Sequence, residues 1–425
     1  MKISIPLTGT RGDVQPAVAL ALELQGRGHD ILVGAPPNLV DFVKSAGIEA
    51  VPCGPDVEKL YSSEKGQKAL AAGSSFKLMP MVAQQMAEYA EQMDDEMIGV
   101  CEGADIVVST LLTEDRAQSI CEAMGIPLVT KHPFPARKNS LYTLPGGIPH
   151  SWNLPKPVVR GSWTLTEKMR GVAFGKYLKS LRRKLDLPPT KDSIETLLRR
   201  DGVPELQAYD SALLPGLAEE WGQQLPFVGF LTLPREARAK MGEQVDEDVM
   251  SWIKDGQAPV YVGFGSIPIR DTGPLLRMVE KVSARLGQRV PVNASWSDID
   301  PNAQVGDHMK IVSNLAYDLV FPYCRAAVHH GGIGTTFESV RAKLPTLVCS
   351  ISFDQPLWGA QVVRLGLGGH LPFSKINEER FEKELAAVLE PQVRERVEQF
   401  APTLDEGTQG SARVADVVEA RAAGA

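Results

Sequence analysis

Short apolar runs alternate with longer amphipathic stretches along most of this 425-residue chain. Short runs bounded by glycine, proline or polar residues are typical of buried parallel strands, and the stretches between them have the periodicity of helices. The segment from Gln15 to Gly26, for example, has a broad apolar face and ends at a glycine, which favours a helix. The predicted strands are residues 2–7, 31–35, 48–53, 105–109 and 127–130, then 260–265, 289–292, 309–312, 325–328 and 346–349.

The alternation of strands and helices occurs in two series, one in each half of the chain. It predicts the α/β class and two doubly wound, parallel-sheet domains of the Rossmann-like kind that face each other across a cleft. Residues 200–235 are rich in Pro, Gly and Leu and lack clear periodicity. We therefore expect an N-terminal domain at 1–215, a linker at 216–235 and a C-terminal domain at 236–425. A last helix at about 410–425 could pack on either domain.

Bulk composition fits an ordinary soluble protein, with 43% hydrophobic and 23% charged residues and a length that suits two or three domains. A net charge of -7 argues against general nucleic-acid binding, which draws on surplus Lys and Arg. The five cysteines are odd in number and form no CxxC pair, so we expect buried thiols. Because the N-terminus soon becomes polar and no apolar stretch reaches about 18 residues, we expect a cytoplasmic protein.

Residues 328–339, VHHGGIGTTFES, carry the clearest chemical signal. They are typical of a strand end, a glycine turn and a helix start. Glycines let the backbone approach an anion closely, and a helix N-terminus presents free N–H groups and about half a positive charge. His330 and Thr335 could add side-chain donors. The segment therefore predicts a site for a diphosphate.

A second candidate loop, TGTRGDVQP at residues 8–16, follows the first predicted strand. Asp13 lies at the start of the first predicted helix. Its carboxylate could simply cap that helix, or it could act as a general base that points into the cleft. The local sequence leaves both interpretations open.

Two further positions in the second half suit a nucleotide. Ser266 follows Gly263 and Gly265 at the end of a predicted strand, where backbone N–H groups and a hydroxyl could meet phosphate or ribose. Glu338 comes eight residues after His330, about two helical turns along. It could reach a ribose or lie on the helix surface.

Asp354 and Gln355 follow the last predicted strand and precede a helix with Pro356 in its first turn. Adjacent carboxylate and amide groups suit a polyhydroxylated ligand. A plain N-cap before a proline is the alternative interpretation.

Together these motifs resemble the GT-B fold glycosyltransferases that use nucleotide sugars. VYVGFGS, VHHGGIGTTFES and the DQPLW loop occur in the order and spacing of that family, and GTRGDVQP matches its N-terminal loop. The resemblance covers both ends of the chain, whereas residues 50–100 and 135–225 carry no motif. Within glycosyltransferase family 1, the nearest branch is that of the bacterial antibiotic and glycolipid enzymes and the sterol glucosyltransferases.

The resemblance implies that the C-terminal domain binds the donor, a nucleotide sugar that serves as co-substrate in a protein without a permanently bound cofactor. The diphosphate would contact the histidine, the threonine and the glycine backbone, Glu338 would bind the ribose, and the Asp354–Gln355 pair would bind the sugar hydroxyls. The implied donor-binding residues are Arg11, Gly12, Ser266, His330, Gly332, Gly334, Thr335, Glu338, Asp354 and Gln355.

The same resemblance places the acceptor on the N-terminal domain. Plant relatives carry a catalytic histidine in a GHxxP pattern, and Asp13 occupies the matching position in GDVQP, so the base would be a carboxylate. The implied enzyme is a hexosyltransferase that inverts the anomeric carbon and uses a UDP- or dTDP-sugar. Its acceptor would be a hydroxyl of a hydrophobic molecule such as a glycolipid, a sterol or a polyketide or peptide natural product. Because the chain has no DxD-like acidic pair in a donor loop, we expect no metal requirement.

Two departures from the family pattern affect the donor site. Ile333 replaces the small residue usual within HHGGAGT, which narrows the space beside the phosphate turn. Ala316 and Tyr317 occupy positions where relatives commonly carry a Pro-His pair, in a loop that borders the nucleobase. This change leaves the choice between uridine and thymidine open.

The acceptor side carries weaker signals. His132 follows a predicted strand and is the one further histidine expected near the acceptor. From Lys168 to Lys184 the chain has seven basic residues and no acidic one, interleaved with apolar residues. Such a helix could contact the inner face of an anionic membrane, or it could be a solvated helix that packs on its own domain. A monomer and a dimer both fit the sequence.

Three other function classes are distinguishable. A nicotinamide oxidoreductase would need a GxGxxG turn with an acidic residue about 20 positions further on, and neither half has one. A nucleotide-sugar epimerase of the same fold would act on the donor alone. A catalytically silent nucleotide-sugar binding protein would bind the donor without transfer, although the presence of Asp13 beside the donor motifs disfavours it.

Overall fold

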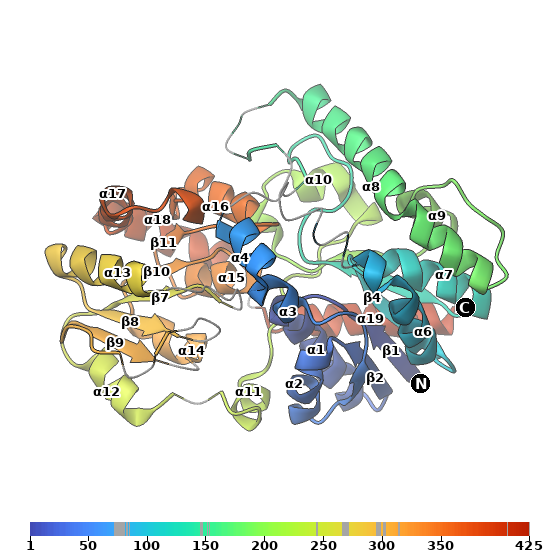
Figure 1. Cartoon of the computed structure of the whole chain (residues 1–425), viewed down its shortest axis with the longest axis horizontal. Coiled ribbons are helices and arrows are strands. Elements are labelled where there is room, and N and C mark those ends of the chain that lie inside the picture. The colour runs from blue at the N-terminus through green and yellow to red at the C-terminus, as the bar shows by residue number, and fades with distance from the viewer. Residues whose placement is uncertain are drawn as a thin grey trace.

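A computed structural model of the chain describes residues 1–71, 81, 84, 86–144, 148–150, 152, 154–243, 245–265, 272–294, 299–300, 303–312, 315–405 and 407–424. It contains two six-stranded sheets, one in each half of the chain (Figure 1). All strand pairs in both sheets are parallel. The predicted fold class, two doubly wound parallel-sheet domains, is confirmed.

The two sheets share one topology. The first has the order β3-β2-β1-β4-β5-β6 and the second the order β12-β11-β10-β7-β8-β9. In each sheet the strand order therefore reverses beside the first strand, β1 or β7. Ligands of open parallel sheets bind at the carboxyl ends of the strands at such a point. The first sheet contains β1 (Lys2–Pro6), β2 (Asp30–Ala35), β3 (Glu49–Pro52), β4 (Ile106–Thr110), β5 (Leu128–His132) and β6 (Glu205–Gln207). The second contains β7 (Val260–Gly263), β8 (Val290–Asn293), β9 (Met309–Val312), β10 (Ala326–His329), β11 (Thr346–Val348) and β12 (Gly368–His370).

Helices connect the strands and surround both sheets (Figure 1). Those of the N-terminal half are α1 (Arg11–Gly26), α2 (Val40–Ser45), α3 (Val57–Ser62), α4 (Glu64–Ala71), α6 (Ala90–Cys101), α7 (Glu114–Met124), α8 (Lys156–Lys184), α9 (Ile194–Arg200) and α10 (Leu217–Trp221). Those of the C-terminal half are α11 (Arg235–Lys240), α12 (Glu247–Lys254), α13 (Gly273–Arg285), α14 (Tyr317–Val320), α15 (Ile333–Arg341), α16 (Gln355–Arg364), α17 (Glu378–Val388), α18 (Pro391–Phe400) and α19 (Gly410–Ala423).

The C-terminal helix α19 returns to the N-terminal half, where Figure 1 shows it in red beside the blue helix α1. Apolar residues of α19, among them Val414 and Val418, are buried in the same core as those of α1 and the first sheet. At the surface, the Arg27 Nη1 atom lies 2.9 Å from Glu419 Oε2. The chain therefore crosses between the halves twice.

The junction between the halves has an apolar core of its own, with aromatic residues from both sides. The rings of Tyr209 and Trp358 lie 5.9 Å apart, and both side chains are fully buried. Beside them, the backbone N–H of Asp405 donates to Asp210 Oδ2 at 2.6 Å. These contacts hold the two sheets in a defined relation, which matters because residues from both contribute to the candidate site.

Two edge strands, β6 and β12, were not among the predicted ones. Each has three residues, and each pairs with a single neighbouring strand. β6 reads Glu-Leu-Gln and β12 reads Gly-Gly-His, so neither has the apolar run that marks a buried strand. In β12 the glycine has a packing reason: a Cβ on Gly368, whose φ is +155°, would lie 1.8 Å from the carbonyl oxygen of Thr346.

All five cysteines are buried and free, as predicted. Among the residues that the structure describes, no helix is both long and apolar enough to span a bilayer.

Candidate active site at the domain junction

Asp13 lies in the first turn of α1, shortly after β1. Thr10 caps this helix: its hydroxyl accepts the backbone N–H of Gly12 at 3.3 Å, and Asp13 Oδ2 accepts the backbone N–H of Thr10 at 2.8 Å. This reciprocal arrangement is a capping box. Gly9 makes room for the carboxylate, because a Cβ at that position, whose φ is +119°, would lie 2.3 Å from Asp13 Oδ2. Thr10 and Gly9 therefore fix the position of the Asp13 side chain.

The Asp13 carboxyl is in a poorly solvated place with mixed charges around it. Burial raises its pKa, whereas hydrogen bonds from Thr10 and the positive charge of Lys131 lower it. Lys131, at the end of β5, is only 5% exposed. Burial lowers the pKa of Lys131 to about 8, against the opposing effect of Asp13. Tyr61 of α3 also faces this carboxylate, and its pKa is raised first by burial and then by the charge of Asp13.

His330 follows β10 and opens the turn into α15. Its ring lies against two glycines: a Cβ on Gly265 would be 2.3 Å from the ring Cε1, and one on Gly332 would be 2.6 Å from Nε2. Burial lowers the pKa of His330 to about 4, so the imidazole is neutral at pH 7. In the described part of the chain its buried Nδ1 has no hydrogen-bond partner. Since an unpaired buried polar atom is costly, this ring is suited to meet a ligand.

His329, next to it, shapes the turn. Its Nδ1 accepts the backbone N–H of Gly331 at 3.0 Å, and its Nε2 lies 3.3 Å from the Ser339 hydroxyl. That hydroxyl donates its own proton to the carbonyl oxygen of Thr336 at 3.0 Å, so Nε2–H of His329 is the donor. Gly331, with φ of +87°, has no room for a side chain, because a Cβ would lie 2.4 Å from Val348 Cγ1. Both ring nitrogens of His329 are thus used within the turn, whereas His330 Nδ1 has no partner among the described residues.

Helix α15 begins with an uncapped N-terminus at Gly332. Its first internal hydrogen bond runs from the N–H of Thr336 to the carbonyl oxygen of Gly332 at 2.9 Å. The N–H groups of residues 333–335 therefore have no acceptor within the helix. Together with the helix macrodipole they favour an anion at this end. Thr335 is buried in this first turn, as is Ile333, which belongs to the apolar core of the junction.

Asp354 and Gln355 lie between β11 and α16. Asp354 occupies the N-cap position without capping a helix N–H, and its Oδ2 instead accepts the indole N–H of Trp358 at 2.7 Å. Burial raises the pKa of Asp354 to about 6, with a further contribution from the negative charge of Asp13. The Gln355 side-chain oxygen accepts backbone N–H groups from residues 351–352 at 2.7 and 3.2 Å. This leaves the amide NH2 group of Gln355 for a ligand.

Contacts across the junction bring the loops of the two halves together. The carboxyls of Asp13 and Asp354 are close enough for the charge of one to raise the pKa of the other. The rings of Tyr61 and Phe353 lie 6.4 Å apart, within an apolar group that also contains Ile351. The loop after β1, helix α3 and the loop after β11 therefore lie close together at the junction.

Two other predicted donor residues have partners within the protein. Glu338 Oε2 accepts a hydrogen bond from Arg341 Nη2 at 2.6 Å in the same helix. Glu338 is buried beside the first turns of α15.

Arg11 forms an ion pair with Glu243, and its Nε donates to Gln15 Oε1 at 3.1 Å. Its guanidinium lies 4.7 Å from the ring centroid of Phe42. The N–H of Gly12 is used by the Thr10 cap described above. Ser266 lies outside the described residues.

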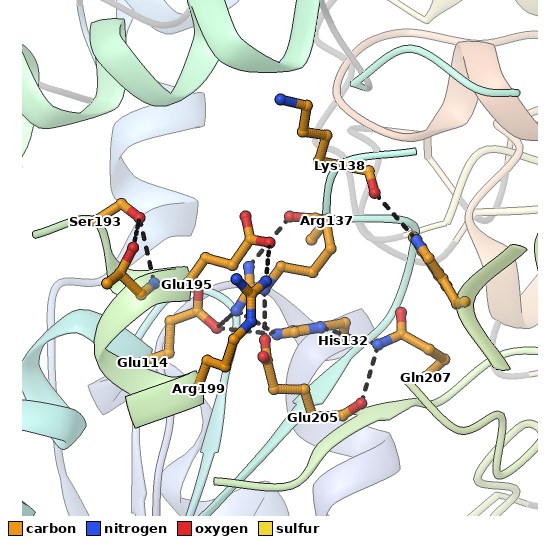
Figure 2. A network of polar contacts seen from close by, with 12 residues as sticks. Glu114, His132, Arg137, Lys138, Ser193, Glu195, Arg199, Glu205 and Gln207 are labelled. Atoms are coloured by element: carbon orange, nitrogen blue, oxygen red, sulfur yellow. Dashed lines mark hydrogen bonds and ion pairs between the residues drawn. The ribbon is translucent and has the colours of Figure 1, made fainter. Parts of the chain in front are cut away.

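His132, the histidine predicted near the acceptor, is fully buried in a polar network at the end of β5 (Figure 2). Its Nε2–H donates to Glu114 Oε2 at 2.9 Å, while its Nδ1 accepts from Gln207 Nε2 at 3.2 Å. Glu114 also accepts Arg137 Nη2 at 2.7 Å and Arg170 Nη2 at 3.1 Å. These positive charges and the His132 hydrogen bond hold the pKa of Glu114 well below its usual range despite burial.

The network links α7, β5, β6 and α8 to the start of the loop after β5. Arg137, in that loop, also pairs with Glu205 of β6, and Arg170 of α8 pairs with Glu114 of α7. Both ring nitrogens of His132 are used inside it. The observed contacts of His132 are therefore those of a residue that supports the loop.

Sequence reasoning missed Lys131 and the Glu114 network. Lys131 follows the run PLVT and precedes His132. Nothing in this local sequence indicates that Lys131 lies beside Asp13. The acidic pair Glu114–Asp115 reads as an ordinary helix start. Only the pairing of β5 with β4 and β6 brings these charges together.

Within the described ranges, no group of three or more His, Cys, Asp or Glu side chains is arranged to hold a metal ion.

Comparisons with known proteins agree with this geometry. Residues 3–143 match the glycosyltransferase family 28 N-terminal domain, and residues 284–407 match the erythromycin biosynthesis protein CIII-like C-terminal domain. An uncharacterized glycosyltransferase of Mycobacterium leprae, ML2348, is 34% identical over 427 residues, which covers 99% of this chain and 97% of that protein. The chain belongs to the GT-B glycosyltransferases.

This glycosyltransferase is also 27% identical to the sterol 3-beta-glucosyltransferase UGT80A2 of Arabidopsis thaliana, with 97% of this chain and 65% of that protein covered. Among solved structures, the fold matches the glycotransferase of kitacinnamycin with a TM-score of 0.71 and 18% identity, covering 99% and 98% of the two chains. It matches glycosyltransferase VinC in complex with dTDP with a TM-score of 0.67 and 16% identity, covering both chains fully. The enzyme is thus related to antibiotic glycosyltransferases and to sterol glucosyltransferases.

The Glu114 network leads to a stability prediction. Glu114→Gln removes the charge that faces two arginines and a histidine in a buried place, so unfolding should become easier by about 3 to 5 kcal/mol. Urea denaturation at pH 7 measures this. The pKa of Glu114 is lowered in the fold, so its contribution is present above its ordinary pKa of 4.5, and the difference between the proteins should shrink only below that pH.

Glu398→Gln, in an exposed pair with Arg394 on α18, is the matched control and should cost less than about 1 kcal/mol. A Glu114→Gln protein as stable as the control would show that the network does not hold the loop.

Proposed function

We propose that the enzyme transfers a hexose, with inversion and without a metal, from a UDP- or dTDP-sugar to a hydroxyl of a hydrophobic acceptor. The observation that carries this proposal is the closeness of the half-buried Asp13 carboxyl to Asp354 of the other domain, next to the strand that leads to His330 and the uncapped N-terminus of α15. One structural relative was solved with dTDP, which fits a nucleoside-diphosphate donor. Assignment to glycosyltransferase family 1 stays a prediction.

Asp13 is the proposed general base. It takes the proton of the acceptor hydroxyl as that oxygen attacks the anomeric carbon, and the bond from this carbon to the diphosphate oxygen breaks with its electron pair. A single displacement of this kind inverts the anomeric configuration. The capping box supports the role, because it fixes the carboxylate at the end of α1 and keeps the anion next to a helix N-terminus.

The departing diphosphate is the proposed ligand of the α15 N-terminus. Charge that builds up on the leaving oxygen would be stabilised by the N–H groups of the first turn, the Thr335 hydroxyl and the His330 ring. His330 is neutral in the free enzyme, and a nearby anion raises the pKa of an imidazole. Arg11 and Gly12 are proposed beside the diphosphate, and Ser266 close to it, on the strength of the sequence motif alone.

The sugar and the nucleoside are proposed to bind on either side of this point. Asp354 offers a carboxylate, and Gln355 an amide NH2, to the sugar hydroxyls. Glu338 is the proposed ribose ligand, and its buried place on α15 supports this role. Tyr317, which stacks on Phe321 with ring centroids 4.8 Å apart, stands near the proposed place of the nucleobase.

The side chains on the outer face of α8 support the proposal that the acceptor is a lipid taken from an anionic membrane. Three basic residues of this helix, Arg170, Arg182 and Lys184, pair with acidic residues of α6 and α7. The remaining face is different: positions separated by seven or four residues share one side of a helix. That side carries the exposed residues Val158, Leu165, Met169, Lys176 and Arg183.

This outer face combines membrane-seeking features. Leu165 and Met169 are 60% and 58% exposed, and Trp152, just before the helix, is 61% exposed. Glu167 is the helix's one acidic residue, and it is turned inward beside Glu195. Apolar side chains flanked by basic ones fit the headgroup region of an anionic bilayer. We therefore propose peripheral membrane contact through the outer face of α8.

The base assignment predicts that Asp13→Asn lowers transfer by about 10²- to 10⁴-fold, because the amide accepts no proton. The amide oxygen can still accept the Thr10 N–H, so the helix start and donor binding should be retained. Release of UDP or dTDP from a panel of nucleotide sugars, with sterols as acceptors, measures the rate. Asp41→Asn, in the exposed first turn of α2, is the matched control. Undiminished transfer by Asp13→Asn would falsify the assignment.

The diphosphate site predicts that His330→Ala weakens binding of UDP and dTDP by about 10- to 150-fold, the loss expected for a hydrogen bond to a charged group. Isothermal titration calorimetry measures the affinities. His308→Ala, a half-buried histidine of the same domain that contacts Glu280 and Ser283, is the control. Equal affinities in the His330 variant and the control would remove His330 from the site.

The α8 surface predicts weaker binding to vesicles of phosphatidylglycerol and phosphatidylcholine when Lys176, Lys179 and Arg183 are changed to Gln. Each basic residue near an anionic bilayer contributes about 1 kcal/mol, so the affinity for the vesicles, measured by co-sedimentation, should fall by about 100-fold. The matched control changes Lys44, Lys240 and Lys383, which are exposed elsewhere. Binding that drops equally in both triple variants, or in neither, would contradict a specific surface.

A further inference from the structure

Lys131 is a buried lysine at the carboxyl edge of the first sheet. It is the fourth residue of β5, where it pairs with Thr110 of β4 and Leu206 of β6. Alternate residues of a strand face opposite sides of the sheet. Val129, two residues earlier, faces the core that contains α1 and α19, so Lys131 lies on that same side, at the end where α1 begins.

The Lys131 ammonium has one counter-charge in this place. Among the described residues it forms no ion pair and no hydrogen bond, and Asp13 is the one group whose charge favours its protonated form. A lysine enclosed in this way is costly, and natural proteins retain few of them without a partner. The reaction proposed above gives Lys131 no role, so its position beside Asp13 needs an explanation.

The titratable groups near Asp13 come from three elements. Tyr61 on α3 and Asp354 before α16 lie on the junction side, and Lys131 on β5 lies on the sheet side. Of these, Asp354 is an acid like Asp13, and repulsion between the two carboxylates favours a proton on one of them. Burial acts in the same direction. Two features oppose them: the N-terminus of α1 with its Thr10 cap, and the ammonium of Lys131.

We propose that Lys131 is a positioning residue for the catalytic base, whose buried ammonium holds the Asp13 carboxylate ionised and oriented at the junction. The inference rests on the proposed function, in which Asp13 accepts the proton of the acceptor hydroxyl. Lys131 neither gives nor takes a proton in that step. Its charge keeps the base ready before the reaction and favours release of the captured proton afterwards.

This arrangement answers a problem that a carboxylate base has and a histidine base lacks. A histidine base is neutral before the reaction, so a second carboxylate nearby is harmless to it. A carboxylate base must be charged before the reaction, in a space that also encloses Asp354. A fixed cation on the opposite side reduces the repulsion between the two anions.

The test is the pH profile of kcat/KM for Lys131→Met, Lys131→Gln and Lys131→Arg. The probe is UDP-glucose or dTDP-glucose, whichever raises the melting temperature of the protein, with cholesterol as acceptor and release of nucleoside diphosphate as the readout. Loss of the ammonium raises the pKa of Asp13. As the pH is lowered, Asp13 is then protonated earlier, so activity should be lost at a higher pH than in the wild type. We expect the acid limb to move up by about one to three pH units in the Met and Gln variants.

The Arg variant keeps the charge, so its acid limb should stay near that of the wild type. Lys310→Met removes a lysine from strand β9 of the other domain and should leave the limb unchanged. The Lys131→Met profile is also recorded in an Asp354→Asn background, which removes the second carboxyl that titrates at the junction. The upward shift should persist there. Two neutral variants are used so that a folding defect in one does not end the test.

An unchanged acid limb in the Met and Gln variants would overturn the inference, whether their rates are normal or uniformly reduced, because a merely structural lysine lowers activity at all pH values alike. Asp13→Asn is measured in parallel. Retained transfer by that variant would instead remove the base assignment itself. Lost transfer by Asp13→Asn together with an unmoved limb in Lys131→Met would remove Lys131 alone.

Discussion

The energetic cost of enclosing negative charge at the domain junction is the constraint on which the rest of the site depends. Asp13 and Asp354 face one space from opposite domains, and the proposed diphosphate would add further negative charge to it. Burial raises the pKa of both carboxyls. The protein meets this with positive groups that are part of the fold: two helix N-termini, at α1 and α15, and the ammonium of Lys131.

Rigid surroundings make such electrostatic compensation effective. Gly9 lets the loop before α1 pass close to the Asp13 carboxylate, and Gly265 and Gly332 enclose the His330 ring. On the sheet side, the Glu114 network uses both nitrogens of His132 and ties the loop after β5 to α7 and α8. Dipoles and charges held in this manner need no reorganisation during a reaction, which is the reason that preorganised sites stabilise charge better than water does.

The sequence predicts most of this fold, because buried parallel strands and amphipathic helices leave strong periodic signals. β6 and β12 escape detection because edge strands with one neighbour need no apolar run on both faces. The motif residues are local: Asp13, His330 and Asp354 each follow a strand, so topology predicts that each lies at the carboxyl edge of its own sheet. Lys131 is different, since its importance comes from strand pairing with β4 and β6 and from its distance along the chain to Asp13, neither of which a single segment encodes.

The two crossings of the chain between the domains hold the two halves of the site together. The first crossing passes Gly229 and Phe230, and the second leads from Asp405 into α19. They lie side by side: Arg413 at the start of α19 donates to the Val228 carbonyl oxygen at 3.1 Å, and a Cβ on Gly410 would lie 2.4 Å from the carbonyl oxygen of Phe230. Together with the apolar core of the junction, the two adjacent crossings tie the domains to each other. Asp13 belongs to one domain and His330 to the other, so the proposed base and the proposed leaving-group site each have positive partners within their own domain.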